Sequence, residues 1–196
     1  MVWNSDAVTV HSASEHRLRT TALVERDPVL RVFQSLLDGA TAKGHVALLA
    51  GEAGIGKTSV LQAAATAHRA SGGHVWWGGC DALDTPHPLA PLLDIAREER
   101  PGFARLLQGP RPELFEAVLG ELRSAPRPVL VVVEDAHWAD DATLDWLKFL
   151  GRRIATTRSV LAVSYRDDEV TASHPLRRVI GVSQLIAVVE PSGLPA

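Results

Sequence analysis

Residues 51–58 read Gly-Glu-Ala-Gly-Ile-Gly-Lys-Thr, which matches the pattern Gly-x-x-x-x-Gly-Lys-Thr at every fixed position. The flanks also fit, because the apolar run Val46–Ala50 precedes the motif and good helix formers follow it from Ser59 to Ala70. Glycines permit backbone conformations and close approaches that a Cβ would obstruct. Successive N–H groups and the helix N-terminus then form a concave anion site. The stretch therefore predicts a phosphate-binding loop between a buried strand and a helix.

Two side chains of this loop have specific expected roles. Lys57 is expected to bridge the β- and γ-phosphates of a nucleotide and to take part in catalysis, and the Thr58 hydroxyl is expected to bind Mg²⁺. The alternative is a glycine-rich turn that binds nothing, which the matching flanks make the weaker interpretation. The residues expected to contact the nucleotide here are Gly51, Glu52, Ala53, Gly54, Ile55, Gly56, Lys57, Thr58 and Ser59.

An acidic pair, Glu134-Asp135, follows the most apolar stretch of the chain, Val129–Val133. A carboxylate at the end of a strand beside the loop would hold Mg²⁺, and an adjacent acid would orient or deprotonate the attacking water. Both motifs would lie at the carboxyl ends of the strands, where parallel sheets bind ligands. We predict that the pair supplies both functions, with the role of each acid left open. The alternative is that the two acids only begin a solvent-facing loop.

Three further residues follow the predicted strands. His137 and Trp138 could line a nucleotide pocket, but the favoured interpretation is that Trp138 packs under the loop and His137 hydrogen bonds to the backbone. Arg166 follows the strand Ser159–Tyr165, where its guanidinium could pair with a γ-phosphate. An equally weighted alternative is a surface arginine paired with Asp167 or Asp168.

The rest of the chain alternates predicted strands and helices. Asp27-Pro28 begins a helix that stops at Asp38-Gly39, and a later helix is capped by Asp140 or Asp141. This order predicts an α/β fold of the P-loop NTPase type, with a five-stranded, mostly parallel sheet between helices on both faces. We expect a disordered leader over residues 1–20, one ATPase domain over 21–190 and a tail over 191–196. The expected strands are Val46–Ala50, His74–Cys80, Pro128–Glu134, Ser159–Tyr165 and Gln184–Val189.

Composition restricts the function classes. The 196 residues are 46% hydrophobic and 22% charged, with a formal net charge of −3. That charge offers no electrostatic case for direct nucleic-acid binding by this segment. No apolar run approaches the roughly 18 residues that span a bilayer, and the first twenty residues lack an apolar signal region. The single cysteine, Cys80, fits a reducing compartment. We therefore expect a cytoplasmic domain without membrane partners.

Four stretches together resemble the ATPase module of the signal-transduction ATPases with numerous domains, specifically the large ATP-binding LuxR-type transcriptional regulators in the AAA/Orc1-like group. The resemblance runs from about residue 22 to residue 190. One departure is Glu25, at a position often filled by glycine in the family. The stretches are Leu23–Asp27, Gly51–Thr58, Val132–Asp140 and Tyr165–Glu169.

The resemblance implies an ATP-dependent switch with slow hydrolysis to ADP. It implies adenine as the base, Arg26 near the adenine or ribose, Arg166 as a γ-phosphate sensor and ATP-dependent self-association. Family members continue into lid, winged-helix, repeat and helix-turn-helix domains, which do not fit after Pro191–Ala196.

Two other functions stay open. One is a stand-alone small kinase, which would need an acceptor site and an arginine-rich lid, for which the segment Ala82–Arg111 supplies only scattered arginines. The other is a non-catalytic interaction module that uses Trp76, Trp77 and Trp146 on its surface, although core packing is the better expectation for each.

Overall fold

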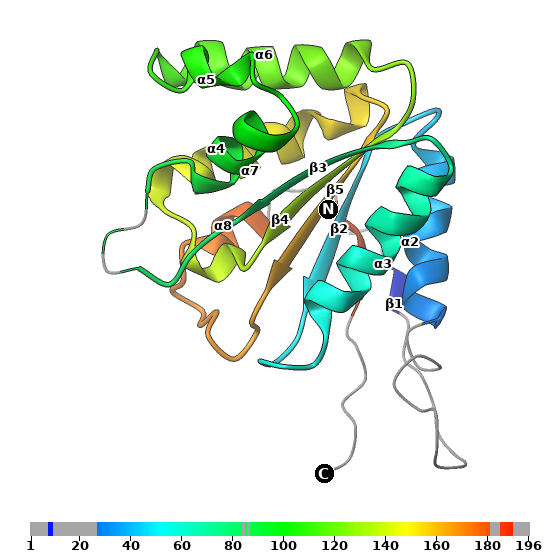
Figure 1. Ribbon diagram of the computed structural model, residues 1–196. Coiled ribbons are helices and arrows are strands. Elements are labelled where there is room, and N and C mark those ends of the chain that lie inside the picture. The colour runs from blue at the N-terminus through cyan, green and yellow to red at the C-terminus, as the bar shows by residue number, and fades with distance from the viewer. Residues whose placement is uncertain (1–7, 10–26, 84, 86, 181–184, 190–196) are drawn as a thin grey trace, which may run out of the picture.

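The computed structural model describes residues 8–9, 27–83, 85, 87–180 and 185–189. Within these ranges six strands form one sheet in the order β1-β6-β2-β5-β4-β3, and every neighbouring pair is parallel (Figure 1). Their bounds are β1 Val8–Thr9, β2 His45–Ala50, β3 His74–Gly79, β4 Val129–Glu134, β5 Ser159–Tyr165 and β6 Leu185–Val189. Parallel pairing brings the carboxyl ends of all these strands to one edge, as the predicted fold class requires.

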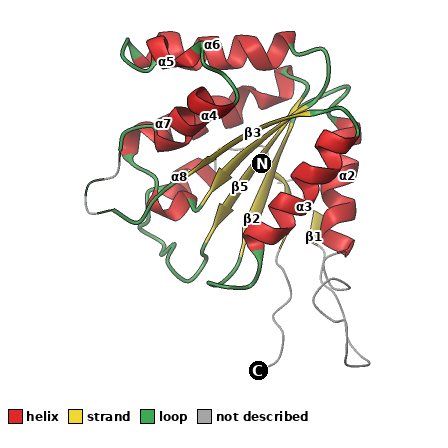
Figure 2. Cartoon of the chain, viewed as in Figure 1, coloured by secondary structure: helices red, strands yellow, loops and turns green. Residues whose placement is uncertain are grey.

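Helices cover both faces of the sheet (Figure 2). On one face lie α2 (Asp27–Gly39) and α3 (Lys57–Ala70). The other face is covered by a larger group, in which the short α5 packs between α4 and α6. Its bounds are α4 Ala90–Glu98, α5 Phe103–Leu106, α6 Arg111–Ser124, α7 Asp141–Arg153 and α8 Leu176–Ile180. Two 3₁₀ turns, η1 (Ala136–Trp138) and η2 (Ile154–Thr156), flank α7.

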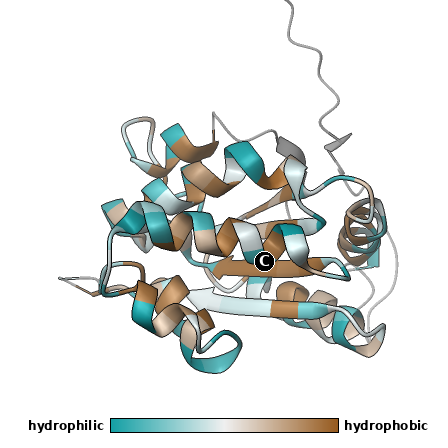
Figure 3. Ribbon diagram, turned by 90° about the horizontal axis from the view of Figure 1, so that it is seen from above, coloured by the Kyte–Doolittle hydropathy of each residue, from teal (hydrophilic) through white to brown (hydrophobic). Residues whose placement is uncertain are grey.

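The strands separate two apolar layers because successive side chains point to opposite faces. On β4, Leu130 and Val132 pack under α2 and α3, whereas Val131 and Val133 pack under the larger helical layer. All four side chains are fully buried. Figure 3 shows the matching amphipathic character of the helices, along which hydrophobic and hydrophilic residues alternate. A strand buried on both faces needs the uninterrupted apolar sequence seen here.

Most predicted elements are confirmed. Helix α2 and strand β5 have the predicted bounds, and the other predicted elements agree to within two residues. The cap of α7 is Asp140, whose carboxylate accepts hydrogen bonds from the N–H groups of Ala142 and Thr143. The same carboxylate accepts the N–H of Leu89, so it also fixes the entry to α4.

The strand that ends in the acidic pair is separated from the strand of the loop by β5, which pairs with both β2 and β4. One expectation about the sheet is corrected. The expected leader over residues 1–20 contains strand β1, which pairs with β6 and brings the described sheet to six strands instead of five. Edge pairing uses backbone groups, so it needs no apolar pattern. The other residues of the leader and the tail over 191–196 lie outside the described residues.

Candidate nucleotide-binding site

The loop 51–58 connects β2 to α3, and its backbone takes conformations that favour glycine. Gly54 has φ 78° and Gly56, at the N-terminus of α3, has φ 96°. Both values lie in the left-handed region, which costs a residue with a Cβ about 1 kcal/mol or more. The side chains of Thr58 and Ser59 are exposed, so the Thr58 hydroxyl is open to solvent. The predicted loop geometry is therefore present at the carboxyl edge of the sheet.

Lys57 lies at the base of this loop with only 7% of its surface exposed. Its Nζ donates hydrogen bonds of 2.7 Å to the carbonyl of Gly51 and 2.9 Å to the carbonyl of Glu52. Burial lowers the pKa of Lys57, and the positive charge of Arg166 acts in the same direction, whereas the negative charge of Asp135 raises it. The ammonium group is thus held inside the loop and interacts with side chains from two neighbouring strand ends.

The acidic pair lies at the end of β4, where the backbone turns sharply. Asp135 has φ 52°, a conformation that non-glycine residues adopt rarely and that recurs at functional sites. Its N–H donates a 3.1 Å hydrogen bond to Oγ of Ser164 on β5. On the other side the carbonyl of Glu134 accepts the N–H of Cys80 at 3.0 Å. Contacts to both neighbouring strands therefore fix the turn that positions the two carboxylates.

The two acids have different surroundings. The indole Nε1 of Trp77 donates a 3.1 Å hydrogen bond to Oε2 of Glu134. The other oxygen, Oε1, is buried and has no hydrogen-bond partner within the described ranges. Asp135 instead acts on Lys57 and on His137 through its charge. Sequence reasoning missed the role of Trp77, which became visible only once the register between β3 and β4 was known.

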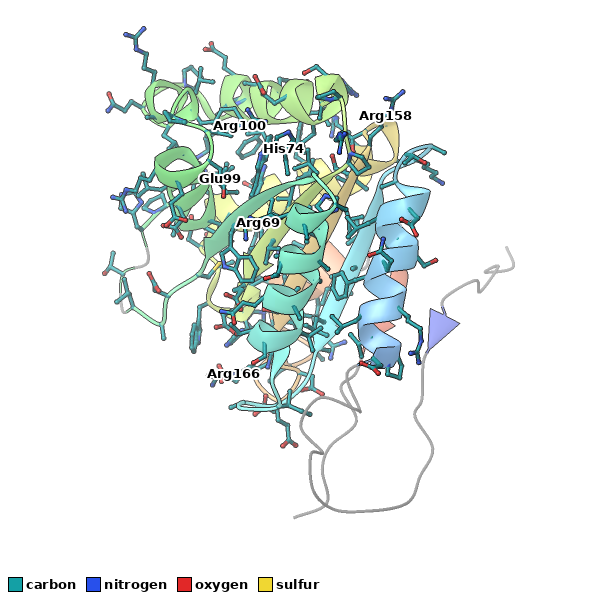
Figure 4. The ribbon with its side chains drawn as sticks, turned by 45° about the vertical axis from the view of Figure 1, so that its right-hand side comes forward. Arg69, His74, Glu99, Arg100, Arg158 and Arg166 are labelled. Carbon is teal, nitrogen blue, oxygen red and sulfur yellow. The ribbon has the colours of Figure 1, made fainter. Side chains whose placement is uncertain are left out.

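Arg166 follows β5 and lies at the edge of the sheet where α3 begins, while Arg158, just before β5, lies toward the opposite edge (Figure 4). Nη1 of Arg166 donates a hydrogen bond to Oε1 of Glu169, and the Arg166 guanidinium carbon lies 4.9 Å from the ring centroid of Trp138. The alternative interpretation paired Arg166 with Asp167 or Asp168, whereas the ion pair in the structure forms with Glu169.

The favoured interpretation of His137 is also wrong. Its side chain is 1% exposed, and Nε2 lies 3.6 Å from Oε2 of Glu169. Neither ring nitrogen has a hydrogen-bond partner, backbone or otherwise, in the described part of the chain. Burial lowers the pKa of His137 despite the opposing negative charges of Glu169 and Asp135. Trp138 is half-buried against the larger apolar layer and lies between His137, at 4.4 Å between centroids, and Arg166.

The residues present fit a bound Mg²⁺. An exposed Thr58 hydroxyl and a buried, unpartnered oxygen on Glu134 are both oxygen donors of the kind that Mg²⁺ prefers. Among the described residues no three His, Cys, Asp or Glu side chains gather in a metal-holding group. That is the usual situation for Mg²⁺, which keeps several waters and is completed by nucleotide phosphates rather than by a cage of protein ligands.

The structure brings together most of the predicted site. The loop, Lys57, Asp135 and Arg166 lie within electrostatic range of one another, and Glu134 lies next to Asp135. Arg26 lies outside the described residues. A groove of about 280 Å³ lies between α2 and α3, lined by residues such as Phe33 and Ala64, and none of the loop residues lines it. No helix in the described ranges is both long and apolar enough to cross a membrane.

A loop of this sequence between β2 and α3, with an acidic pair two strands away, defines a P-loop ATPase of the α/β class. The family model named AAA ATPase domain matches residues 22–163. The chain therefore belongs to the AAA ATPase domain family, for which binding of a nucleotide, typically with Mg²⁺, is expected. A comparison with curated protein sequences finds no match.

Solved structures support the fold. Cdc6p from Pyrobaculum aerophilum is 19% identical, with a TM-score of 0.57, and the match covers 88% of this chain and 46% of that one. The Aeropyrum pernix Orc1 protein, solved in complex with DNA, is 16% identical with a TM-score of 0.51, over 83% and 44%. A Drosophila ORC structure bound to AT-rich DNA and Cdc6 is 16% identical with a TM-score of 0.54, over 86% and 29%. The chain spans less than half the length of each.

Proposed function

We propose that this chain binds Mg-ATP at residues 51–58 and hydrolyses it slowly, as the nucleotide switch of a larger LuxR-type regulator or a truncated relative. The observation that carries the proposal is the buried Lys57 ammonium, held by two carbonyls of the loop and acted on by Asp135 and Arg166. Burial of a cation that has no carboxylate at hydrogen-bond distance is unfavourable unless a ligand supplies the opposite charge. The β- and γ-phosphates of a nucleotide supply that charge.

Each residue of the proposed site then has a specific role. Loop N–H groups and Lys57 bind the phosphates, and the Thr58 hydroxyl and an acid of the 134–135 pair hold Mg²⁺. When bound, the ion neutralises charge that develops on the phosphate oxygens. The other acid accepts a proton from the attacking water or orients it. Arg166 pairs with the γ-phosphate, and the resemblance assigns Arg26 to contact with the adenine or ribose.

The alternative functions have less support. A surface built from tryptophans is not favoured, because Trp76 and Trp146 are fully buried and Trp77 hydrogen bonds to Glu134. Of the large hydrophobic side chains that the structure describes, Leu83 is the exposed one. For a kinase, Arg100 would have to serve a lid, yet it lies over the Trp76 ring at 5.0 Å and pairs with Glu121.

The proposed context extends beyond the site. We expect the ATPase domain to occupy residues 21–190, to select adenine nucleotides and to self-associate when ATP is bound. The net charge of −3 argues against direct contact of this segment with DNA. DNA contact, where it occurs, would come from a helix-turn-helix domain of a longer regulator.

Thermal unfolding with and without Mg-ATP tests the proposal. A ligand that binds only the folded state stabilises it by mass action and so raises the melting temperature. At a ligand concentration of a hundred times Kd, the stabilisation is about 2.7 kcal/mol. We expect this rise in the parent protein and its loss in Lys57→Ala. The matched control is Lys43→Ala, an exposed lysine before β2, which should keep the rise. An equal rise in Lys57→Ala would exclude the loop as the binding site.

A further inference from the structure

The side chains around Arg166 suggest a function for Glu169. The Arg166 side chain is 28% exposed, and its guanidinium contacts two groups, the Glu169 carboxylate and the face of the Trp138 ring. A guanidinium pairs with carboxylate and phosphate in the same planar, two-pronged manner. The Glu169 carboxylate thus accepts from Nη1 of Arg166 a hydrogen bond of the kind that a phosphate oxygen would accept.

Glu169 also lies close to the turn that follows β4. Its Oε1 accepts the hydrogen bond from Arg166, while Oε2 lies 3.6 Å from Nε2 of His137. His137 follows Asp135 by two residues and is buried, so its ring position is fixed. The carboxylate thus pairs with the residue after β5 and lies near the turn after β4.

The two acids adjacent to Arg166 do not share this arrangement. Asp167 and Asp168 are exposed and form no ion pair with Arg166, although both stand closer to it in sequence. Their charges act on Lys57 instead. The contact is therefore specific to Glu169, and Asp168 offers a matched control in the same loop.

We propose that Glu169 is a positioning residue that holds Arg166 against Trp138 in the nucleotide-free protein, and that the γ-phosphate of ATP replaces the Glu169 carboxylate on the guanidinium. No covalent bond changes in this exchange, since one anion replaces another. The inference rests on the proposed function, because it needs a nucleotide bound at residues 51–58. It adds that the site discriminates ATP from ADP through the release of an internal ion pair.

The strength of the pair sets the expected effect. Exposed ion pairs of this kind contribute little, so competition by Glu169 should weaken ATP binding by about two- to fivefold. ADP has no γ-phosphate and should not compete with Glu169. Removing the carboxylate should therefore tighten ATP binding and leave ADP binding unchanged.

The test is titration calorimetry of the whole chain with Mg-ADP and with a non-hydrolysable Mg-ATP analogue. The variants are Glu169→Gln, Asp168→Asn, Arg166→Ala and the double variant Arg166→Ala/Glu169→Gln. Glu169→Gln should raise the ratio of ATP-analogue affinity to ADP affinity by about two- to fivefold. Asp168→Asn removes a charge that acts on Lys57 but no contact with Arg166, so it should raise this ratio less. In the Arg166→Ala background the Glu169 substitution should have no effect.

The outcomes separate this inference from the proposed function. An unchanged or lowered ratio in Glu169→Gln, with ATP still bound in a Lys57-dependent manner, would overturn the positioning role alone. An increase that persists in the Arg166→Ala background would also overturn it, because the effect would not pass through Arg166. Failure of the parent protein to bind either nucleotide would instead contradict the proposed function and remove the basis of the inference.

Discussion

The indole N–H of Trp77 hydrogen bonds to Oε2 of Glu134 at 3.1 Å, across the parallel strands β3 and β4. In the register of this pair, Trp77 lies opposite Val132 and Gly79 lies opposite Glu134. The contact is therefore diagonal, between residues two positions apart on one face, which only a long side chain can span. It fixes one carboxylate oxygen of the acidic pair and leaves the other available.

The strength of this contact can be measured with a double-mutant cycle. Trp77→Phe keeps an aromatic ring but removes the donor, and Glu134→Leu removes both carboxylate oxygens and with them the acceptor. We expect a coupling free energy of about 1.5–3 kcal/mol between the two substitutions in urea unfolding, as for a hydrogen bond to a charged group. Strictly additive effects would contradict the hydrogen bond.

The amides of the acidic pair should separate its two functions. Because an amide keeps the size of the side chain but is neither a base nor an anionic metal ligand, the water-activating acid should lose turnover and retain ATP binding. A loss of about 10²-fold or more in turnover is expected at that position. The metal-holding acid should instead show weaker Mg²⁺ dependence of binding. Normal hydrolysis by both Glu134→Gln and Asp135→Asn would show that the pair is not the catalytic one.

The close approach of α4 to β3 gives a prediction about the fold. A Cβ at Gly78 would lie 2.2 Å from the carbonyl oxygen of Pro91, whereas a Cβ at Gly79 would meet nothing within 4 Å. Gly78→Ala should therefore push α4 from the sheet and lower the free energy of unfolding by about 1–3 kcal/mol. Gly79→Ala serves as the control and should change it much less. Equal urea midpoints for the two variants would argue against this packing.

His45 gives a pH dependence with a definite sign. Its Nδ1 is buried without a hydrogen-bond partner among the residues described. Burial, followed by the charge of Lys43, lowers the pKa of His45 below 6.5. Since the unfolded chain then binds more protons, the free energy of unfolding should fall as pH drops below about 6.5, by at most about 1.4 kcal/mol per pH unit for this group. His45→Gln should flatten the curve between pH 6.5 and the lower folded-state pKa; an unchanged slope would contradict this assignment.

The local elements could be predicted because their signals are local. The apolar run of β5, the Asp27 to Gly39 periodicity of α2 and the Asp140 cap each depend on residues close in sequence. The loop 51–58 was predictable for the same reason, since its chemistry is contained in eight consecutive residues. These features cover most of the fold and the phosphate-binding part of the site.

The remaining features depend on contacts between distant segments. Nothing in the composition of β5 indicates that it lies between β2 and β4, because strand order follows from how helices pack on the sheet. The contact of Trp77 with Glu134 depends on the register between β3 and β4. The approach of His137 to Glu169 depends on how the turn after β4 packs beside the segment after β5. Sequence periodicity contains none of this information.

The most direct test of the central claim is Mg²⁺-dependent ATP turnover by the purified chain, with Lys57→Ala as the control. The site described here predicts slow release of phosphate that requires Mg²⁺ and disappears in Lys57→Ala, because Lys57 is the cation that contacts the β- and γ-phosphates. Equal turnover by the parent protein and Lys57→Ala, or no phosphate release by the parent while ATP is bound, would contradict the claim that this chain hydrolyses ATP at residues 51–58.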